Sequence, residues 1–214
     1  MTTFTPMLLV VVLLLNFLAL GTSRVRAVIN ASAAQGVVLG ALTLLAHSSV
    51  NLEVVLIAAA AALVKGMLIP AMLLKALRGA VIRREVEPLV GFVPSLLLCA
   101  VTTGGALVFS STLPLAPQHA GSLMVPTSLA TVLAGFLVLT TRRKAVTQVV
   151  GYLMLENGIY IMGLMLLEAM PLMVEVGVLL DLLVGIFVMA IIISHISREF
   201  SSTDTSRLSA LKEG

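Results

Sequence analysis

Seven stretches of the chain stay apolar over a length that crosses the hydrocarbon core of a bilayer. Such a core is roughly 30 Å thick and takes about 20 helical residues. Lipid offers no water to satisfy backbone N–H and C=O groups, so only helices or closed barrels can cross it. Because the runs are continuous rather than alternating, they favour helices. We predict spans at 6–23, 27–47, 51–77, 89–112, 121–141, 145–168 and 172–197.

The composition supports a membrane protein, since 59% of the 214 residues are hydrophobic and only 11% are charged. A soluble domain of this size has no use for so much apolar surface. One cysteine, Cys99, rules out a disulfide framework or an iron–sulfur cluster built by this chain alone, and we interpret it as a small packing residue. Met1 to Met7 lacks Lys and Arg, so we expect a retained first helix rather than a cleaved signal peptide.

Twelve of the thirteen basic residues fall in connections on one side of such a bundle. The connections on the other side have none, which places the amino end outside and the carboxyl end in the cytoplasm. We therefore predict an all-α integral membrane bundle of seven transmembrane helices. Residues 1–120 form four N-terminal helices, 121–200 a three-helix unit and 201–214 a polar cytoplasmic tail. The twelve residues are Arg24, Arg26, Lys75, Arg78, Arg83, Arg84, Arg142, Arg143, Lys144, Arg198, Arg207 and Lys212.

A weak internal repeat relates the first three predicted helices to the last three. Gln35-Gly-Val-Val falls where Glu156-Asn-Gly-Ile falls, and Glu53-Val-Val-Leu falls where Glu175-Val-Gly-Val falls. Duplication of a three-helix unit explains the pattern, and so does chance similarity among apolar helices. Both explanations stay open at this point.

Three charged residues lie in the middle of predicted spans: Lys65, Glu156 and Asp181. A charge at the bilayer centre costs about 3 kcal/mol unless it faces protein or water, so such residues indicate a functional path. Buried carboxyl groups beside each other or beside a lysine can take up and release protons near neutral pH, as a proton relay requires. The alternative is a static ion pair of Lys65 with Glu156 or Asp181 that fixes helix register.

Further polar residues extend this prediction to a secondary polar path. Tyr152 and Tyr160 lie one turn on either side of Glu156 and share its face. Gln35 and Asn16 are intramembrane amides of the kind that usually form helix–helix hydrogen bonds. Glu53 and Glu175 lie near the outer surface, as a proton exit or as a solvated rim.

The remaining polar and glycine motifs do not indicate a cofactor or a catalytic centre. His47, His119 and His195 do not form the facing pair that a membrane haem needs. We find no phosphate-binding loop and no nucleophile motif, and we expect no metal, cofactor or nucleic acid. Gly104-Gly105 lies inside a predicted span and is interpreted as a packing feature.

Two motifs resemble a known family: Gly151-Tyr-Leu-Met-Leu-Glu156-Asn157-Gly158 and Asp181-Leu-Leu-Val-Gly185. Around them, residues 125 to 200 look like the three-helix K subunit of bacterial complex I, and the seven-span layout resembles the hydrogenase-4 component E family. In the K subunit two successive helices each carry a buried glutamate. The second aligns with Asp181, whereas the first falls at Leu153, and this chain has its acid at Glu156 instead.

The resemblance implies a non-catalytic membrane-arm subunit of an energy-converting hydrogenase or complex I-like oxidoreductase in a prokaryotic inner membrane. Its partners would be antiporter-like and quinone-cavity-like membrane subunits and a peripheral hydrogenase arm. Glu156, Asp181 and Lys65 would contribute to a proton or sodium path driven by redox chemistry elsewhere. A stand-alone secondary transporter and a passive membrane anchor are the alternatives.

Overall fold

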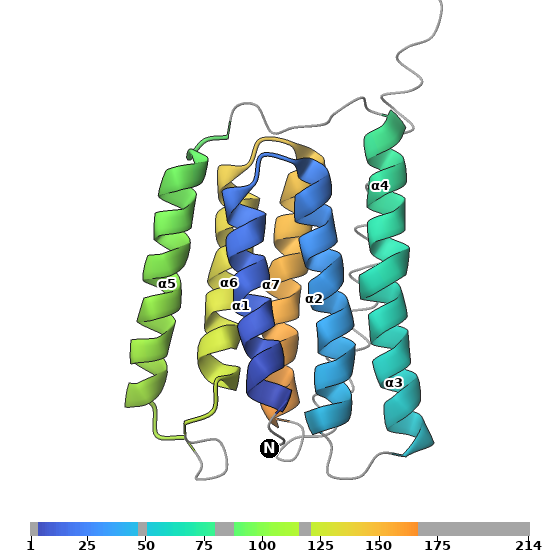
Figure 1. Cartoon of the computed structure of the whole chain (residues 1–214), viewed down its shortest axis with the longest axis vertical. Coiled ribbons are helices and arrows are strands. Elements are labelled where there is room, and N and C mark those ends of the chain that lie inside the picture. The colour runs from blue at the N-terminus through green and yellow to red at the C-terminus, as the bar shows by residue number, and fades with distance from the viewer. Residues whose placement is uncertain (1–3, 47–50, 80–87, 116–120, 167–214) are drawn as a thin grey trace, which may run out of the picture.

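The computed structural model describes residues 4–46, 51–79, 88–115 and 121–166, and within these ranges every regular element is a helix (Figure 1). The helices lie side by side and alternate in direction along the chain. Three consecutive elements, α3, η1 and α4, form one rod in which η1 is a π-helical turn. The bounds are α1 (Phe4–Gly21), α2 (Val25–Ala46), α3 (Leu52–Leu63), η1 (Val64–Leu68), α4 (Ile69–Gly79), α5 (Phe92–Thr112), α6 (Met124–Thr141) and α7 (Ala145–Leu166).

Five helical segments are long and apolar enough to cross a membrane, which confirms an all-helical membrane fold for the described chain. α7 also has 22 residues but is not among these five segments. The seventh predicted span, 172–197, lies outside the described residues, so the count of seven spans and the orientation stay predictions. The five segments are Phe4–Gly21, Val25–Ala46, Val54–Lys75, Phe92–Thr112 and Met124–Thr141.

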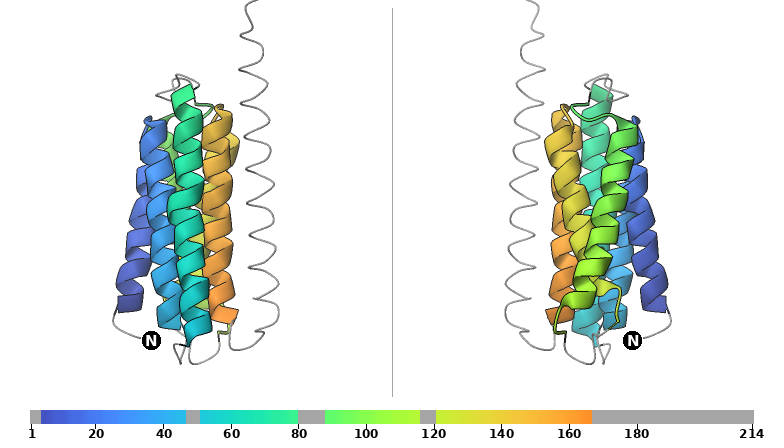
Figure 2. Two further views of the ribbon diagram at one scale, coloured as in Figure 1. Left: turned by 90° about the vertical axis from the view of Figure 1, so that its right-hand side faces the viewer. Right: turned by 90° about the vertical axis from the view of Figure 1, so that its left-hand side faces the viewer.

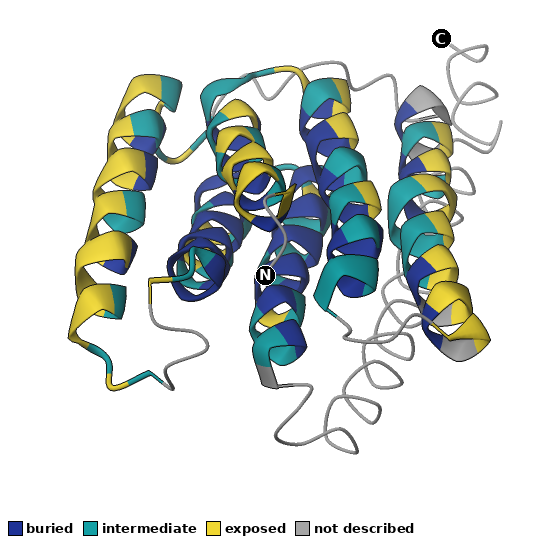
Figure 3. Cartoon of the chain, turned by 60° about the horizontal axis from the view of Figure 1, so that its bottom comes forward, coloured by how far each residue is buried: buried dark blue, intermediate teal, exposed yellow. Residues whose placement is uncertain are grey.

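Four helices form the centre of the bundle, and two rods flank it on opposite sides. α1, α2, α6 and α7 occupy the centre, with α5 on one side and the α3–η1–α4 rod on the other (Figures 1 and 2). Exposed residues gather on α5 and on the outer side of the α3–η1–α4 rod, whereas α6 and α7 are mostly buried (Figure 3). The central helices therefore provide the protein interior, where polar side chains can be held away from lipid.

Two apolar clusters fill that interior, and a polar layer separates them. One cluster includes Ala19, Ala31 and Met154, and the other includes Val12, Leu39 and Ile161. Between these positions on α1, α2, α6 and α7 lie buried polar residues that we call the polar layer. Its members are Asn16, Gln35, Thr131, Glu156 and Asn157.

Glycines bring the central helices closer together than larger residues permit. A Cβ atom added to Gly135 of α6 would lie 2.3 Å from the backbone nitrogen of Leu155, and one added to Gly151 of α7 would lie 2.5 Å from that of Leu139. Both distances are well inside van der Waals contact, so neither position accepts a side chain without backbone movement. Close approach through small residues is how membrane helices gain packing contacts without a hydrophobic driving force.

Gly104 and Gly105 of α5 do not play this part within the chain. A Cβ atom added to either glycine meets nothing within 4 Å among the described residues. The interpretation of this pair as a packing feature is therefore wrong for contacts inside the described chain. The reason is the peripheral position of α5, which presents these glycines to the outside of the bundle.

Apart from Lys65, the described basic residues lie where helix ends meet at one end of the bundle, which we call the basic end (Figure 1). Among the basic residues at this end, Arg142 is buried, with an exposed fraction of only 2%. Its Nη2 donates to Leu20 O at 2.7 Å, its Nη1 donates to Val90 O at 3.2 Å, and its guanidinium lies 4.7 Å from the ring centre of Phe92. An arginine on the last carbonyls of α1 favourably meets the negative end of the helix dipole. Arg142 thus joins α1, the α6–α7 connection and the start of α5.

Candidate functional site

Lys65 reaches the bundle interior from the π-helical turn η1. The N–H of Ile69 donates to Val64 O, five residues back, and Pro70 follows immediately. A proline has no N–H to donate and its ring clashes with the carbonyl four residues earlier, so a widened turn before Pro70 accommodates it. Single π-helical turns of this kind occur frequently at functional sites.

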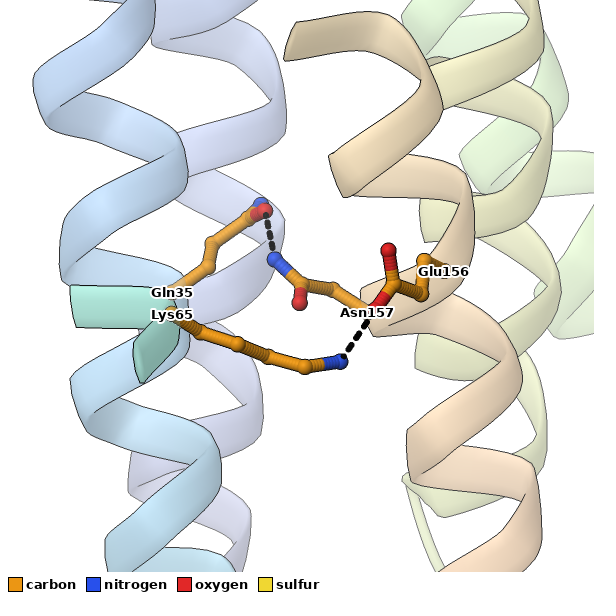
Figure 4. Close-up of polar contacts among 4 residues, drawn as sticks. All are labelled: Gln35, Lys65, Glu156 and Asn157. Carbon is orange, nitrogen blue, oxygen red and sulfur yellow. Dashed lines mark hydrogen bonds and ion pairs between the residues drawn. The ribbon is translucent and has the colours of Figure 1, made fainter. Parts of the chain in front are cut away.

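Two glycines let this turn lie directly against α2. A Cβ atom added to Gly36 would lie 2.7 Å from Lys65 Cβ, and one added to Gly66 would lie 2.6 Å from a methyl carbon of Val37. The backbone of η1 therefore touches α2 at the level of the polar layer. From there the extended lysine side chain passes to α7, as Figure 4 shows.

Lys65 and Glu156 form an ion pair inside the bundle, with 3.0 Å between Nζ and Oε1 (Figure 4). The two side chains are only 11% and 8% exposed. A buried ion requires a counter-charge, because desolvation costs several times more than an exposed pair regains. The ion pair joins η1 to α7 and places two titratable groups within hydrogen-bond distance of each other. We call these two residues the charged pair.

Tyr160 lies one turn beyond Glu156 on α7 and contacts the same lysine. Lys65 Nζ is 5.1 Å from the centre of the Tyr160 ring, within cation–π range. The Tyr160 hydroxyl and Thr43 Oγ1 of α2 are 2.8 Å apart. Thr43 Oγ1 in turn donates to Leu39 O at 2.9 Å, so the phenol can donate its proton to Thr43.

Neutral side chains form a second polar connection through the layer, which we call the amide chain. Asn157 Nδ2 donates to Gln35 Oε1 at 3.3 Å (Figure 4), and Gln35 Nε2 donates to Asn16 Oδ1 at 2.7 Å. Asn16 Nδ2 then donates to Thr131 Oγ1 at 2.9 Å, and Gln35 Nε2 also lies 3.5 Å from Val12 O. All four central helices contribute one member, and each of the four side chains is at most 2% exposed.

The structure brings together some of the residues that the sequence singled out and leaves others apart. Glu156 and Lys65 are in contact, Tyr160 lies against Lys65, and Gln35 belongs to the amide chain. The expectation that Asn16 and Gln35 form helix–helix hydrogen bonds is confirmed. Leu153, where the K-subunit glutamate falls, is instead part of an apolar cluster.

The other predicted site residues have less structural information. Tyr152 is half-buried on α7, one turn before Glu156. Glu53 lies in the first turn of α3, and Asp181 and Glu175 lie outside the described residues. The proton-relay role of all these residues stays a prediction. Within the described ranges, no three His, Cys, Asp or Glu side chains gather where they could hold a metal ion.

Several members of the site were not singled out from the sequence. Asn157 follows Glu156 directly, and the presence of an amide side chain inside a predicted span could have identified it from the sequence. The spacing of five residues from Lys65 to Pro70 was the available signal for the π-helical turn. For Thr43 and Thr131 no signal was available, because threonine is common in membrane helices and often donates to its own helix backbone.

Comparison with known proteins gives one long match and several short ones. The chain is 34% identical to the uncharacterized protein Rv0085 of Mycobacterium tuberculosis over 192 residues, which cover 88% of this chain and 86% of that protein. It is 31% identical over 80 residues to hydrogenase-4 component E of Escherichia coli K12 and of Shigella flexneri, a segment that covers 37% of each chain. No family model matches, and no solved structure is significantly similar.

Proposed function

This chain belongs to the same family as Mycobacterium tuberculosis Rv0085, and we propose that it is a membrane-arm subunit of an energy-converting hydrogenase or complex I-like oxidoreductase. In this role it contributes buried charged groups to a proton or sodium path, while the redox chemistry takes place in other subunits. The segment shared with hydrogenase-4 component E supports membership of a multi-subunit membrane complex. The five segments that can cross a membrane, together with the relatives in Mycobacterium tuberculosis and Escherichia coli, support the proposal of an inner-membrane location in a prokaryote.

The observation that carries the proposal is the charged pair in the bundle interior. Lys65 comes from the flanking α3–η1–α4 rod and Glu156 from the central helix α7. Their Nζ and Oε1 atoms are 3.0 Å apart, and the pair lies between two apolar clusters. Proton transfer from the ammonium to the carboxylate converts two charges into two neutral groups without moving a helix. A pair with these two states can respond to a change of charge in a neighbouring subunit, which is what coupling to redox chemistry requires.

The partners follow from the same proposal. Antiporter-like and quinone-cavity-like membrane subunits would lie beside the bundle, and a peripheral hydrogenase arm would meet one of its ends. Within the described helices, the flanking α5 and α3–η1–α4 rods have the apolar outer faces that a neighbouring membrane subunit or lipid can cover. Asp181 would continue the path beyond Glu156 in this proposal.

A passive membrane anchor is the second candidate, and the depth of the charged pair favours it as well. In an anchor, this buried pair, whose side chains are 11% and 8% exposed, would have the static role of fixing the register of η1 against α7. A stand-alone transporter is less well supported, because such carriers bind substrate at unwound helices. The described helices contain a π-helical turn but no unwound segment, and Pro94 lies in the first turn of α5, where proline is tolerated.

Glu156→Gln separates the coupled subunit from the anchor. The amide keeps the shape of the side chain but cannot take up a proton. We expect hydrogen-driven proton movement in inverted membrane vesicles to fall by about a hundredfold, the usual contribution of a positioned proton-transfer group. The complex should still assemble, as measured by the chains that co-purify.

Thr131→Val is the matched control, since it removes a buried hydroxyl from the amide chain without touching a titratable group. Proton movement in this variant should equal that of the unmodified complex. If Glu156→Gln assembles and moves protons at the full rate, the relay proposal fails and the anchor is favoured.

A further inference from the structure

Two hydroxyl groups, those of Tyr160 and Thr43, lie next to the charged pair. Tyr160 is four residues beyond Glu156 on α7, about 6 Å further along the helix axis. Its ring lies under the Lys65 ammonium, and its hydroxyl is 2.8 Å from Thr43 Oγ1. The described neighbours of Lys65 therefore include a carboxylate and a phenol from successive turns of one helix.

Thr43 carries this connection close to an end of the bundle. It lies three residues before Ala46, the last residue of α2, which is about 5 Å along the helix axis. This end is opposite to the basic end and is where the described chain begins at Phe4, so we call it the amino end (Figure 1). The last carbonyls of α2 point the same way and form the negative end of its dipole, which favours a positive charge there.

We propose that Tyr160 and Thr43 form the proton route between the charged pair and the amino end. The proposal rests on the proposed function and adds a direction to it. A proton from the amino end binds Thr43 Oγ1, and the original hydroxyl proton of Thr43 turns from Leu39 O to the Tyr160 oxygen. Lys65 gives a proton to the Glu156 carboxylate, and the neutral amine that results then accepts the proton of the Tyr160 hydroxyl and becomes an ammonium again.

This sequence of transfers balances. One proton leaves the solution and one carboxylate becomes a carboxylic acid, while Lys65 remains an ammonium and both hydroxyl groups remain neutral. Rotation about the side-chain bonds of Lys65 takes Nζ from the ring face of Tyr160 to the phenol oxygen and back to Glu156. The four-carbon stem of lysine allows such a rotation within a fixed backbone.

The amide chain cannot relay protons in this way, although it lies in the same layer. Asn157, Gln35 and Asn16 keep both protons on each amide nitrogen, and the carbonyl oxygens of Gln35 and Asn16 accept hydrogen bonds from Asn157 and Gln35 respectively. Passing a proton along such a chain would require the imidic acid form of every amide. Hydroxyl groups donate and accept through one oxygen, so of these two described connections the Tyr160–Thr43 one can relay protons by exchange.

The test follows protonation of Glu156 from each side of the membrane. The full chain is inserted in one orientation into liposomes, and the pH is lowered rapidly on one side only. Infrared absorption of the Glu156 carboxyl group, identified by its loss in Glu156→Gln, reports the arrival of the proton. We expect Tyr160→Phe and Thr43→Val each to slow this arrival from the amino end by about a hundredfold. Arrival from the basic end should keep its rate.

Tyr160→Phe is the sharper of the two variants because it keeps the ring that contacts Lys65 and removes only the hydroxyl. Asn16→Leu is the control in the amide chain and should leave both rates unchanged. If protonation of Glu156 from the amino end is as fast in Tyr160→Phe as in the unmodified chain, the inference is wrong. If Glu156→Gln moves protons at the full rate in the vesicle assay, the proposed function is wrong. If Glu156 in the unmodified chain never changes protonation from either side, both fail.

Discussion

Two polar systems cross the middle of this bundle, and they leave α7 at adjacent residues. Glu156 belongs to the charged pair with Lys65, and Asn157 begins the amide chain that passes through Gln35 to Asn16. Successive residues of an α-helix differ by about 100° around its axis, so the two side chains point to different neighbours. One system joins the central helices to a flanking rod, and the other joins the central helices to one another.

The two systems also differ in what they can change. The amide chain is at most 2% exposed, each of its hydrogen bonds has a fixed donor, and its members are neutral at any physiological pH. The charged pair is slightly more exposed and consists of two groups that can each gain or lose charge. Burial of polar groups in a membrane bundle is therefore not one property. Amide groups join helices through neutral hydrogen bonds, whereas a lysine and a glutamate join them through groups whose charge can change.

Lys65→Met should break the charged system with the largest loss of stability. It removes the counter-charge that lies 3.0 Å from a buried carboxylate, and such a loss typically costs about 3–5 kcal/mol. The free energy of unfolding in mixed micelles measures this change. Lys75→Met is the matched control, because Lys75 is exposed on the same rod and its replacement should cost less than about 0.5 kcal/mol.

The double variant Lys65→Met with Glu156→Leu should recover most of the loss. With both charges gone, the site becomes an apolar contact between η1 and α7, which is often as stable as the buried pair. If Lys65→Met alone is as stable as Lys75→Met, the ion pair contributes nothing to the stability of the fold. In that case the comparison between charged and neutral systems would lose its energetic basis.

Gly36→Ala should disturb the charged system through the backbone, with a smaller effect. The new Cβ atom would lie 2.7 Å from Lys65 Cβ and 2.8 Å from its carbonyl carbon, so α2 and η1 must separate. Overpacking of this kind costs about 1–3 kcal/mol. Distances between spin labels on α2 and on the α3–η1–α4 rod should increase together with the loss of stability.

Gly104→Ala provides the control for Gly36→Ala. Its added Cβ atom meets nothing within 4 Å among the described residues, and alanine is the better helix former by about 0.5–1 kcal/mol. Stability should therefore stay the same or rise slightly. If both glycine variants lose the same stability, the close approach of η1 to α2 is not what positions Lys65.

The positions of the helices were predictable from the sequence, whereas their pairing was not. Each apolar run in the described ranges forms a helix whose ends lie within about three residues of the predicted ones, because bilayer thickness fixes the length. The sequence left Lys65 with either Glu156 or Asp181 as its partner. Glu156 is in contact with it because Gly36 and Gly66 bring η1 against α2, and such glycine contacts depend on which helices are neighbours.

Arg142 shows the same limit at the basic end. Its place in a short connection rich in positive charge predicted only the side of the membrane on which it lies. The structure buries it against Leu20, Val90 and Phe92, which come from segments far away in sequence. Net charge in a loop predicts topology, but it does not show which of three adjacent basic side chains turns inward.

Asn16→Leu should break the amide chain at its centre with the smallest effect of the three. Asn16 donates to Thr131 and accepts from Gln35, and interhelical hydrogen bonds in membrane proteins contribute about 0.6 kcal/mol each. We therefore expect a loss of about 1 kcal/mol, measured with the same unfolding assay, and faster backbone hydrogen exchange in α1. Hydrogen-driven proton movement should stay unchanged, because the chain carries no titratable group.

Thr140→Val supplies the comparison for this last variant, since Thr140 is exposed and bonds only to carbonyls of its own helix. Its replacement should change neither stability nor hydrogen exchange. A large fall in proton movement in Asn16→Leu, with stability reduced by only about 1 kcal/mol, would mean that the amide chain positions Glu156 through Asn157. The two systems would then be one, because fastening the central helices would also set the distance over which the charged pair exchanges its proton.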